Sequence, residues 1–287
     1  MRHLSLCSGI GGIDLAAEWA GFETVAQCEI DDYASKVLAK NFKGVPNLHD
    51  IRTVTNKRIR EFGIDPAGIT VISAGFPCQP YSLAGKGRGD RDDRDLWGEV
   101  ARVLEEVRPR WFVGENTPGL FSREDQRYFR RILSDLTELG YQVGWGIWGA
   151  CDVGAPHKRD RVFIVGRYTD GERAKEKCSI QKRKNSESCG VGGNISDTAF
   201  KRRDKITIQC GQFIEGVQEE RGGRIQISGC KPNGMYSGAK WWEVEPDVGR
   251  VAYGVSHWVD RLRCLGNAVV PAQIYPIFEA IAEFERL

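Results

Sequence analysis

Short apolar runs alternate with amphipathic helical patterns over the first part of the chain, up to about residue 165. The apolar runs have the length of buried strands and lie at residues 2–7, 23–30, 69–75, 110–116, 141–150 and 161–167. Helical patterns lie between most of them, at residues 12–21, 31–42, 95–107 and 123–140. Because strands that alternate with helices form βαβ units, this pattern predicts a doubly wound α/β fold with a mostly parallel sheet.

The alternation stops after Arg167. Polar residues and glycine dominate from there to about residue 240, with short β-like pieces at 206–214 and 223–228, which predicts a small loop-rich domain or a partly disordered insert. Residues 167–240 hold 15 Lys and Arg against 9 Asp and Glu, while the whole chain has a net charge of only +2. Such clustered charge suits a polyanion, and a solvated surface is the alternative. A last helical pattern at 271–287 has an apolar face that we expect to pack on the first domain.

Length, hydropathy and cysteine content limit the class of protein. The 287 residues suffice for one large domain and a smaller one. No apolar run approaches the roughly 18 to 20 residues of a membrane span, so we expect a cytoplasmic protein without a membrane partner. The nine cysteines include no CxxC pair, which favours reduced thiols and predicts no metal site. A metal site built from Cys178, Cys189, Cys210 and Cys230 is the less favoured alternative.

A glycine-rich turn joins the first predicted strand to the first predicted helix. The sequence Ser8-Gly9-Ile10-Gly11-Gly12 allows a ligand to approach the backbone, and Glu29 follows the second strand, where an acidic side chain reaches a ribose hydroxyl. These features predict a nucleoside cofactor, with a purely structural turn as the alternative. Asp50 is a candidate for an adenine amino group or for a helix cap.

A single cysteine, Cys78, lies between two prolines in "GFPCQPYS", directly after the strand predicted at 69–75. Ligands bind at the carboxyl ends of parallel strands, and the prolines stiffen the loop, so Cys78 is a candidate nucleophile; an inert buried thiol is the alternative. The strand at 110–116 ends in Glu115 and Asn116, at the same edge of the sheet. A carboxyl group there can serve as the acid for a heterocyclic substrate.

Two arginines, Arg159 and Arg161, precede the strand at 161–167 and share one side if the chain is extended. They are candidates for binding phosphate or stabilising an electron-rich intermediate, and surface salt bridges are the alternative.

These stretches, in this order, resemble the bacterial and phage DNA cytosine-5 methyltransferases. The matching segments are "SGIGG", Glu29, Asp50, "GFPCQPYSLAGKG", "ENTPG", "KRDRVFIVG" and "RLRCLGNAVVPAQ". The resemblance implies a Rossmann-like fold of the S-adenosylmethionine-dependent type. Residues 1–166 with 259–287 would form the catalytic domain, and residues 167–258 a target-recognition domain that reads double-stranded DNA. It also implies a monomer. Whether a cognate restriction endonuclease belongs to the same system stays open, and a stable complex with one is not expected.

The resemblance implies a mechanism on a flipped cytosine, in which Cys78 adds to C6 and C5 takes a methyl group from S-adenosylmethionine. Glu115 would hold the ring N3 and the exocyclic amine, which favours protonation as the adduct forms. The remaining catalytic positions would be Pro77, Asn116, Arg159 and Arg161. The cofactor would be held by Ser8, Gly9, Ile10, Gly11, Gly12, Glu29, Ile30, Asp50, Ile51, Asn267 and Ala268. Gln79 and Ser82 would contact DNA.

Three positions depart from the family pattern, namely Cys7 in place of an aromatic residue, Thr117 in place of valine and His157 in place of glutamine. None of them is the nucleophile or the acid. Two alternatives remain open: a relative that methylates cytosine in transfer RNA, and a catalytically silent DNA-binding protein. The separate recognition segment favours DNA over transfer RNA, and the intact Cys78 and Glu115 argue against a silent protein.

Overall fold

The computed structural model describes residues 1–77, 95–121, 125–169, 207–210, 224–226 and 257–287. The described strands are β1 (Arg2–Leu6), β2 (Glu23–Cys28), β3 (Ile69–Ala74), β4 (Trp111–Asn116), β5 (Tyr141–Trp148), β6 (Arg161–Tyr168), β7 (Thr207–Cys210) and β8 (Arg224–Gln226). The described α-helices are α1 (Gly12–Trp19), α2 (Asp32–Asn41), α3 (Asn56–Glu61), α4 (Trp97–Val107), α5 (Asp125–Glu138), α7 (Trp258–Asn267) and α8 (Pro271–Arg286). Single turns of 3-10 helix occur at η1 (Ile51–Thr53), η2 (Pro66–Gly68), η4 (Pro118–Phe121) and η5 (Ala150–Val153). None of the helices in these ranges is long and apolar enough to cross a membrane.

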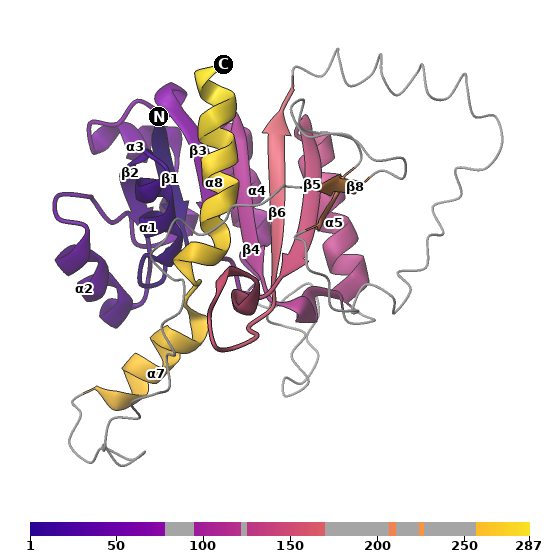
Figure 1. Cartoon of the computed structure of the whole chain (residues 1–287). Helices are drawn as coiled ribbons and strands as arrows, with labels where there is room; N and C mark the ends of the chain where they lie inside the picture. Colours follow the sequence, from indigo (N-terminus) through magenta and orange to yellow (C-terminus); the bar gives the residue numbers. More distant parts are fainter. Residues whose placement is uncertain (78–94, 122–124, 170–206, 211–223, 227–256) are drawn as a thin grey trace.

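The strands form one sheet in the order β2-β1-β3-β4-β6-β5-β7-β8 (Figure 1). Strands β2, β1, β3 and β4 pair in parallel, while β6 pairs antiparallel with both β4 and β5. The connection from β5 to β6 contains the single turn η5 and no α-helix that could cross over the sheet, in keeping with an antiparallel pair. The predicted α/β fold is confirmed. The sheet is mixed, because β5 runs in the same direction as β1 to β4 while β6 between them runs in the opposite direction. Strands β7 and β8 lie within the two β-like pieces predicted after Arg167 and continue the sheet beyond β5.

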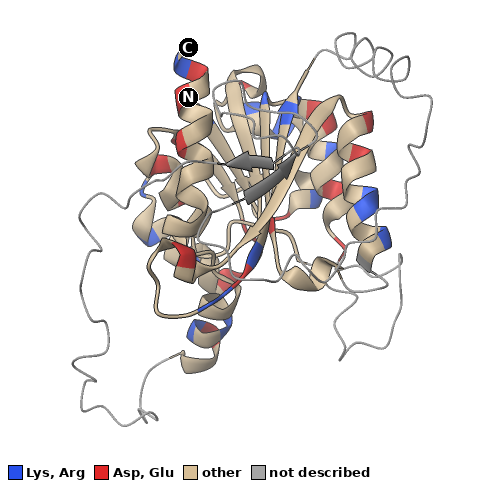
Figure 2. Cartoon of the chain, turned by 45° about the vertical axis from the view of Figure 1, so that its right-hand side comes forward, with Lys and Arg blue, Asp and Glu red and all other residues tan. Residues whose placement is uncertain are grey.

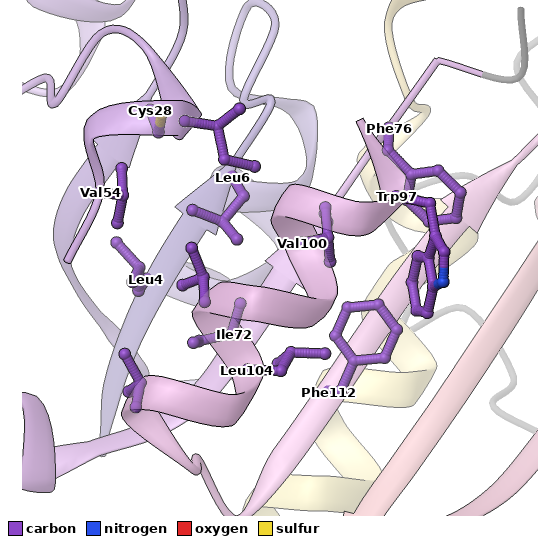
Figure 3. Packing of buried hydrophobic residues seen from close by; sticks show 14 of the residues in the cluster. Leu4, Leu6, Cys28, Val54, Ile72, Phe76, Trp97, Val100, Leu104 and Phe112 are labelled. Carbon is purple, nitrogen blue, oxygen red and sulfur yellow. The ribbon is translucent and has the colours of Figure 1, made fainter. Parts of the chain in front are cut away.

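Helices cover both faces of the sheet, as a doubly wound fold requires. On one face, Leu4, Ile72 and Phe112 pack against Val100 and Leu104 of α4, and Figure 3 shows these side chains meeting in one cluster. Helix α5 contributes to the same cluster. On the other face, α1 and α8 pack together against the sheet, and α8 lies in front of the strands in Figure 1. Charged residues, coloured in Figure 2, lie largely on the helices and loops around this core.

The C-terminal helix α8 returns to the large domain, as its apolar face predicted. Its Ile277 and Phe278 are buried with residues of α1. Near its end, Glu285 forms an ion pair with Arg110 at 2.7 Å and accepts a hydrogen bond from Trp111 Nε1 at 2.9 Å. The end of the chain is thus fixed beside the amino end of β4. The division at residues 166 and 259 stays a prediction.

A buried histidine joins the three parallel strands β2, β1 and β3. His3 Nδ1 lies 3.0 Å from Thr24 Oγ1, and His3 Nε2 lies 2.7 Å from Ser73 Oγ. Complete burial lowers the pKa of His3 to about 3, so the ring is neutral near pH 7. The same face buries Asp14, whose carboxyl accepts hydrogen bonds from Ser5 and Gln27 and whose pKa burial raises to about 6.

The pKa of His3 predicts an acid-sensitive contribution to stability. The folded pKa lies below that of the unfolded chain, so this contribution is intact above about pH 6.5 and is lost as the pH falls toward 3. Asp14 changes the stability in the opposite direction as the pH falls, because its pKa is raised in the folded protein. The measurement therefore compares wild type with His3→Gln, since both proteins retain Asp14 and its effect cancels in the difference. We expect the difference in unfolding free energy between the two proteins to shrink by roughly 3 kcal/mol from pH 7 to pH 4.5. A difference that stays constant over this range would contradict the prediction.

Candidate active site

The carboxyl ends of β1 to β4 gather most of the predicted site residues at one edge of the sheet. The glycine turn follows β1, Glu29 follows β2, Phe76 and Pro77 follow β3, and Glu115 lies at the end of β4. Strand β6 brings Arg161 to the same edge because it runs antiparallel to β4, so that its first residue lies beside the last residues of β4. The reversed direction of β6 therefore places a cation next to the candidate acid.

Glu115 and Arg161 form the centre of this edge. Arg161 Nε lies 2.9 Å from Glu115 Oε1, and Glu115 is only 7% exposed. Burial raises the pKa of Glu115 to about 7, against the opposing effect of the positive charges of Arg161 and Arg159. A carboxyl group with this pKa holds its proton in a large fraction of molecules at neutral pH and can release it to a substrate.

Asn116 holds the chain that leads to Cys78. Its Nδ2 donates a hydrogen bond to the Phe76 carbonyl at 3.0 Å, and its Oδ1 accepts one from Thr117 N at 2.8 Å. Pro77 follows and is exposed. Cys78 itself, with Gln79 and Ser82, lies outside the described residues. The structure thus fixes the position of the main chain two residues before the candidate nucleophile.

Arg159 contacts the end of helix α7. Its Nη2 donates to the carbonyls of Leu265, Gly266 and Ala268, and its backbone φ of 39° departs from the extended conformation that the sequence suggested. These carbonyls belong to the last turn of α7 and the residues after it, which a guanidinium stabilises as a C-cap. Arg159 therefore connects the start of β6, which lies at the site, with the segment that carries Asn267 and Ala268.

The three glycines of the turn have different surroundings. A side chain at Gly11 would collide with the Phe42 ring, and one at Gly12 with the Val269 carbonyl. These two glycines are needed for packing, which supports the structural interpretation at these positions. Gly9 has a φ of 56°, and a Cβ there would meet nothing within 4 Å. Gly9 is thus the position of the turn that leaves space for a ligand.

Glu29 faces this space. Its Oε2 accepts a hydrogen bond from Gly9 N at 2.7 Å, and its Oε1 accepts one from Asp31 N at 2.8 Å. Ile30, beside it, is 61% exposed. Ser8 is buried, and its Oγ bonds the carbonyl of Ser5 and the amide of Cys28. A ligand at this point would meet the Glu29 carboxylate and the Ile30 side chain, and only the main chain of Ser8.

The segment after β2 presents Asp50 at the start of η1. Asp50 Oδ1 accepts a hydrogen bond from Arg52 N at 3.0 Å, so the side chain does cap a helical turn, as one interpretation predicted. Its carboxylate is about one-third exposed. Ile51 is 4% exposed and belongs to the core, so a contact from this residue to a ligand would come from its main chain.

A cavity of about 540 Å³ is lined in part by the glycine turn. It includes four of the predicted cofactor residues, Ile10, Gly11, Gly12 and Ala268, and none of the group around Glu29 and Asp50. Asn267 ends α7 and is exposed. Four of the predicted cofactor residues therefore line this cavity, whereas Glu29, Ile30 and Asp50 lie outside it.

Comparison with known proteins decides the family. Residues 1–243 match a model of the family described as C-5 cytosine-specific DNA methylase. The chain belongs to this family. The resemblance that the motifs suggested is thereby confirmed.

Individual members of the family match part of the chain. The type II methyltransferase M.NgoBI of Neisseria gonorrhoeae is 40% identical over 169 residues, 58% of this chain and 50% of that protein. M.FnuDI of Fusobacterium nucleatum is 36% identical over 171 residues, 59% of this chain and 48% of that protein. A solved structure described as a prophage-encoded DNA modification methyltransferase (E. coli) is 28% identical, with a TM-score of 0.52, covering 61% of this chain and 48% of that one. The chain thus spans about half the length of the curated relatives it matches.

One residue that supports the site was missed in the sequence. Gln273 of α8 is fully buried, and its Nε2 donates to the carbonyls of Trp148 at 2.7 Å and Arg159 at 3.0 Å. Trp148 Nε1 in turn donates to the Gln273 carbonyl at 2.6 Å. This amide fastens the returning helix to the loop that carries Arg159. The available signal was a glutamine among the apolar residues of the helix predicted at 271–287.

Proposed function

We propose that this member of the family methylates cytosine at C5 in duplex DNA, with S-adenosylmethionine as methyl donor and Cys78 as nucleophile. Family membership supports the reaction class. The observation that carries the proposal is the buried Glu115 carboxyl 2.9 Å from Arg161, because an acid with a pKa of about 7 can protonate a pyrimidine nitrogen at neutral pH.

The edge around Glu29 fits the proposed methyl donor. A carboxylate has about four lone-pair sites, so Glu29 retains acceptor capacity for ribose hydroxyls beyond its two amide contacts. Ile30 offers an apolar surface for an adenine ring, Asp50 an acceptor for its amino group, and Gly9 the space beside them. When bound, S-adenosylmethionine supplies an electrophilic methyl group.

The side chains would then act in sequence on a cytosine that has left the base stack. The Cys78 thiolate forms a bond from its sulfur to C6, which shifts electron density into the ring. Glu115 gives its proton to N3, and Arg161 keeps the carboxyl group in place. C5 would then take the methyl group as the bond from that group to the cofactor's sulfur breaks. Loss of the C5 proton to a base and return of the N3 proton to Glu115 would accompany cleavage of the C6–S bond, which frees the Cys78 thiolate.

Other residues of the edge hold these groups in position. We assign Asn116 and Pro77 to the start of the loop that carries Cys78, because Asn116 bonds the carbonyl of Phe76. We assign Arg159 to the segment with Asn267 and Ala268, through its bonds to the end of α7. All three residues have positioning roles, since none of their side chains needs to touch the base.

Recognition of DNA is assigned to the middle of the chain. Residues 1–166 with 259–287 would form the catalytic domain, and residues 167–258 would read the target site. The excess of basic residues between 167 and 240 supports this division, as does the packing of α8 on α1. Gln79 and Ser82 would contact the DNA beside the flipped base.

Labelled S-adenosylmethionine and mixed-sequence duplex DNA test the proposed reaction. We expect label on C5 of cytosine within one short motif, located by bisulfite sequencing, and no label on a transfer RNA transcript. A duplex containing 5-fluorocytosine should trap the enzyme covalently, because a fluorine at C5 blocks the release step. Tight DNA binding with neither methyl transfer nor covalent trapping would overturn the proposal. Label on transfer RNA and none on DNA would show that transfer RNA, rather than duplex DNA, is the substrate.

A further inference from the structure

Arg102, in the middle of α4, binds the segment that carries Asp50. Its Nη2 donates to the Ile51 carbonyl at 2.9 Å, and its Nη1 donates to the Val54 carbonyl at 2.7 Å. These two carbonyls bracket η1, the single turn that Asp50 caps. One guanidinium therefore holds both ends of the turn that presents the Asp50 carboxylate.

Two glutamates of α4 hold the guanidinium itself. Arg102 Nε lies 2.7 Å from Glu99 Oε2, and Arg102 Nη1 lies 2.9 Å from Glu106 Oε1. Glu106 also accepts a hydrogen bond from the amide of Asn56 at 3.0 Å. Ion pairs along one helix face contribute little by themselves. The contacts with Ile51, Val54 and Asn56 are different, because they join α4 to a separate segment of the chain.

The local structure transmits the position of the main chain to the Asp50 side chain. Thr53 Oγ1 donates to the Asp50 carbonyl at 2.8 Å, and Arg52 N donates to Asp50 Oδ1. The side chains of Ile51 and Val54 are buried in the core that α4 covers, where Figure 3 labels Val54. A shift of η1 relative to α4 would therefore move the carboxylate with it.

We propose that Arg102 is a positioning residue for cofactor binding, which sets the affinity for S-adenosylmethionine by fixing η1 and Asp50. The inference rests on the proposed function, since it takes Asp50 to face the adenosine part of the cofactor. Arg102 acts through the main chain and touches neither cofactor nor DNA. Loss of its two carbonyl contacts should weaken cofactor binding and leave the chemical step intact.

The test is Arg102→Gln in the full chain, with binding of S-adenosylmethionine measured by calorimetry and methyl transfer measured at saturating cofactor. We expect the Kd and KM for the cofactor to rise about tenfold, less than the roughly 100-fold cost of a 1 Å misplacement, because the side chains of Ile51 and Val54 still hold η1 in the core. The kcat and the Kd for DNA should stay near the wild-type values. Arg102→Lys, which can still donate to a carbonyl, should recover part of the affinity.

Two further variants separate the possible failures. The control is Arg58→Gln, which removes an exposed ion pair between Arg58 and Glu61 at 3.0 Å, a distance similar to those of the Arg102 ion pairs. This variant should leave the Kd for S-adenosylmethionine unchanged. Asp50→Asn tests the underlying site: if wild type does not bind the cofactor, or if Asp50→Asn binds it as tightly, the proposed cofactor site fails. If Asp50→Asn weakens binding while Arg102→Gln lowers only the melting temperature, the role of Arg102 is overturned. Should Arg102→Gln not fold, an unchanged Kd in a folded Arg102→Lys would overturn it as well.

Discussion

Replacing Cys78 by alanine should abolish methyl transfer, with a loss of roughly 10⁴-fold or more in kcat. Without a sulfur to add to C6, C5 of cytosine stays a poor nucleophile, and the thiols of Cys7 and Cys28 cannot substitute. Cys7 and Cys28 have pKa values raised by burial, that of Cys7 to about 12, so they hold little thiolate. The change should leave the fold intact, since the chain up to Phe76 is held by Asn116.

The matched control is Cys151→Ala, because Cys151 is an exposed free cysteine in η5. Initial rates of label transfer to duplex DNA measure the effect, and trapping on 5-fluorocytosine DNA reports the covalent step separately. Cys151→Ala should behave as wild type in both assays, and Cys78→Ala should fail in both. Methyl transfer by Cys78→Ala at more than a few per cent of the wild-type rate would rule out the covalent mechanism.

The sequence pattern was sufficient for most of the fold. The apolar runs at 69–75 and 110–116 became β3 and β4, because buried parallel strands need no polar alternation. The position of β6 was not predictable in the same way. Two strands in succession indicate an antiparallel pair, but the insertion of β6 between β4 and β5 depends on how both faces of the sheet are covered.

The candidate site shows the same division between local and tertiary information. Glu115 and Arg161 were both candidates from the sequence, yet their contact follows from the reversed direction of β6. The glycines of the turn were equivalent in the sequence, and only the packing of Phe42 and Val269 distinguishes Gly11 and Gly12 from Gly9. Hydrogen bonds from Arg159 to the end of α7 join segments more than 100 residues apart, which no local pattern encodes.

Replacing Glu115 by glutamine should lower kcat by roughly 10²- to 10⁴-fold, the range attributed to general acid catalysis. Glutamine keeps the shape of the side chain and a hydrogen-bonding oxygen for Arg161, but it has no proton to give to N3. An exposed glutamate of α4, Glu105, provides the matched control, and Glu105→Gln should retain the wild-type rate.

The pH dependence of Glu115→Gln makes this prediction specific. In wild type the pKa of Glu115 is raised to about 7, so the carboxyl is protonated below that pH and kcat/KM should fall as the pH rises from 7 to 9. The nucleophile acts in the opposite direction, because a thiol with a pKa of about 8.5 gains thiolate over the same range. Wild type should therefore show a bell-shaped profile, while Glu115→Gln should keep only the rising limb, at a much lower rate. If the falling limb persists unchanged in Glu115→Gln, a group other than Glu115 donates the proton to N3, and the role proposed for Glu115 is wrong.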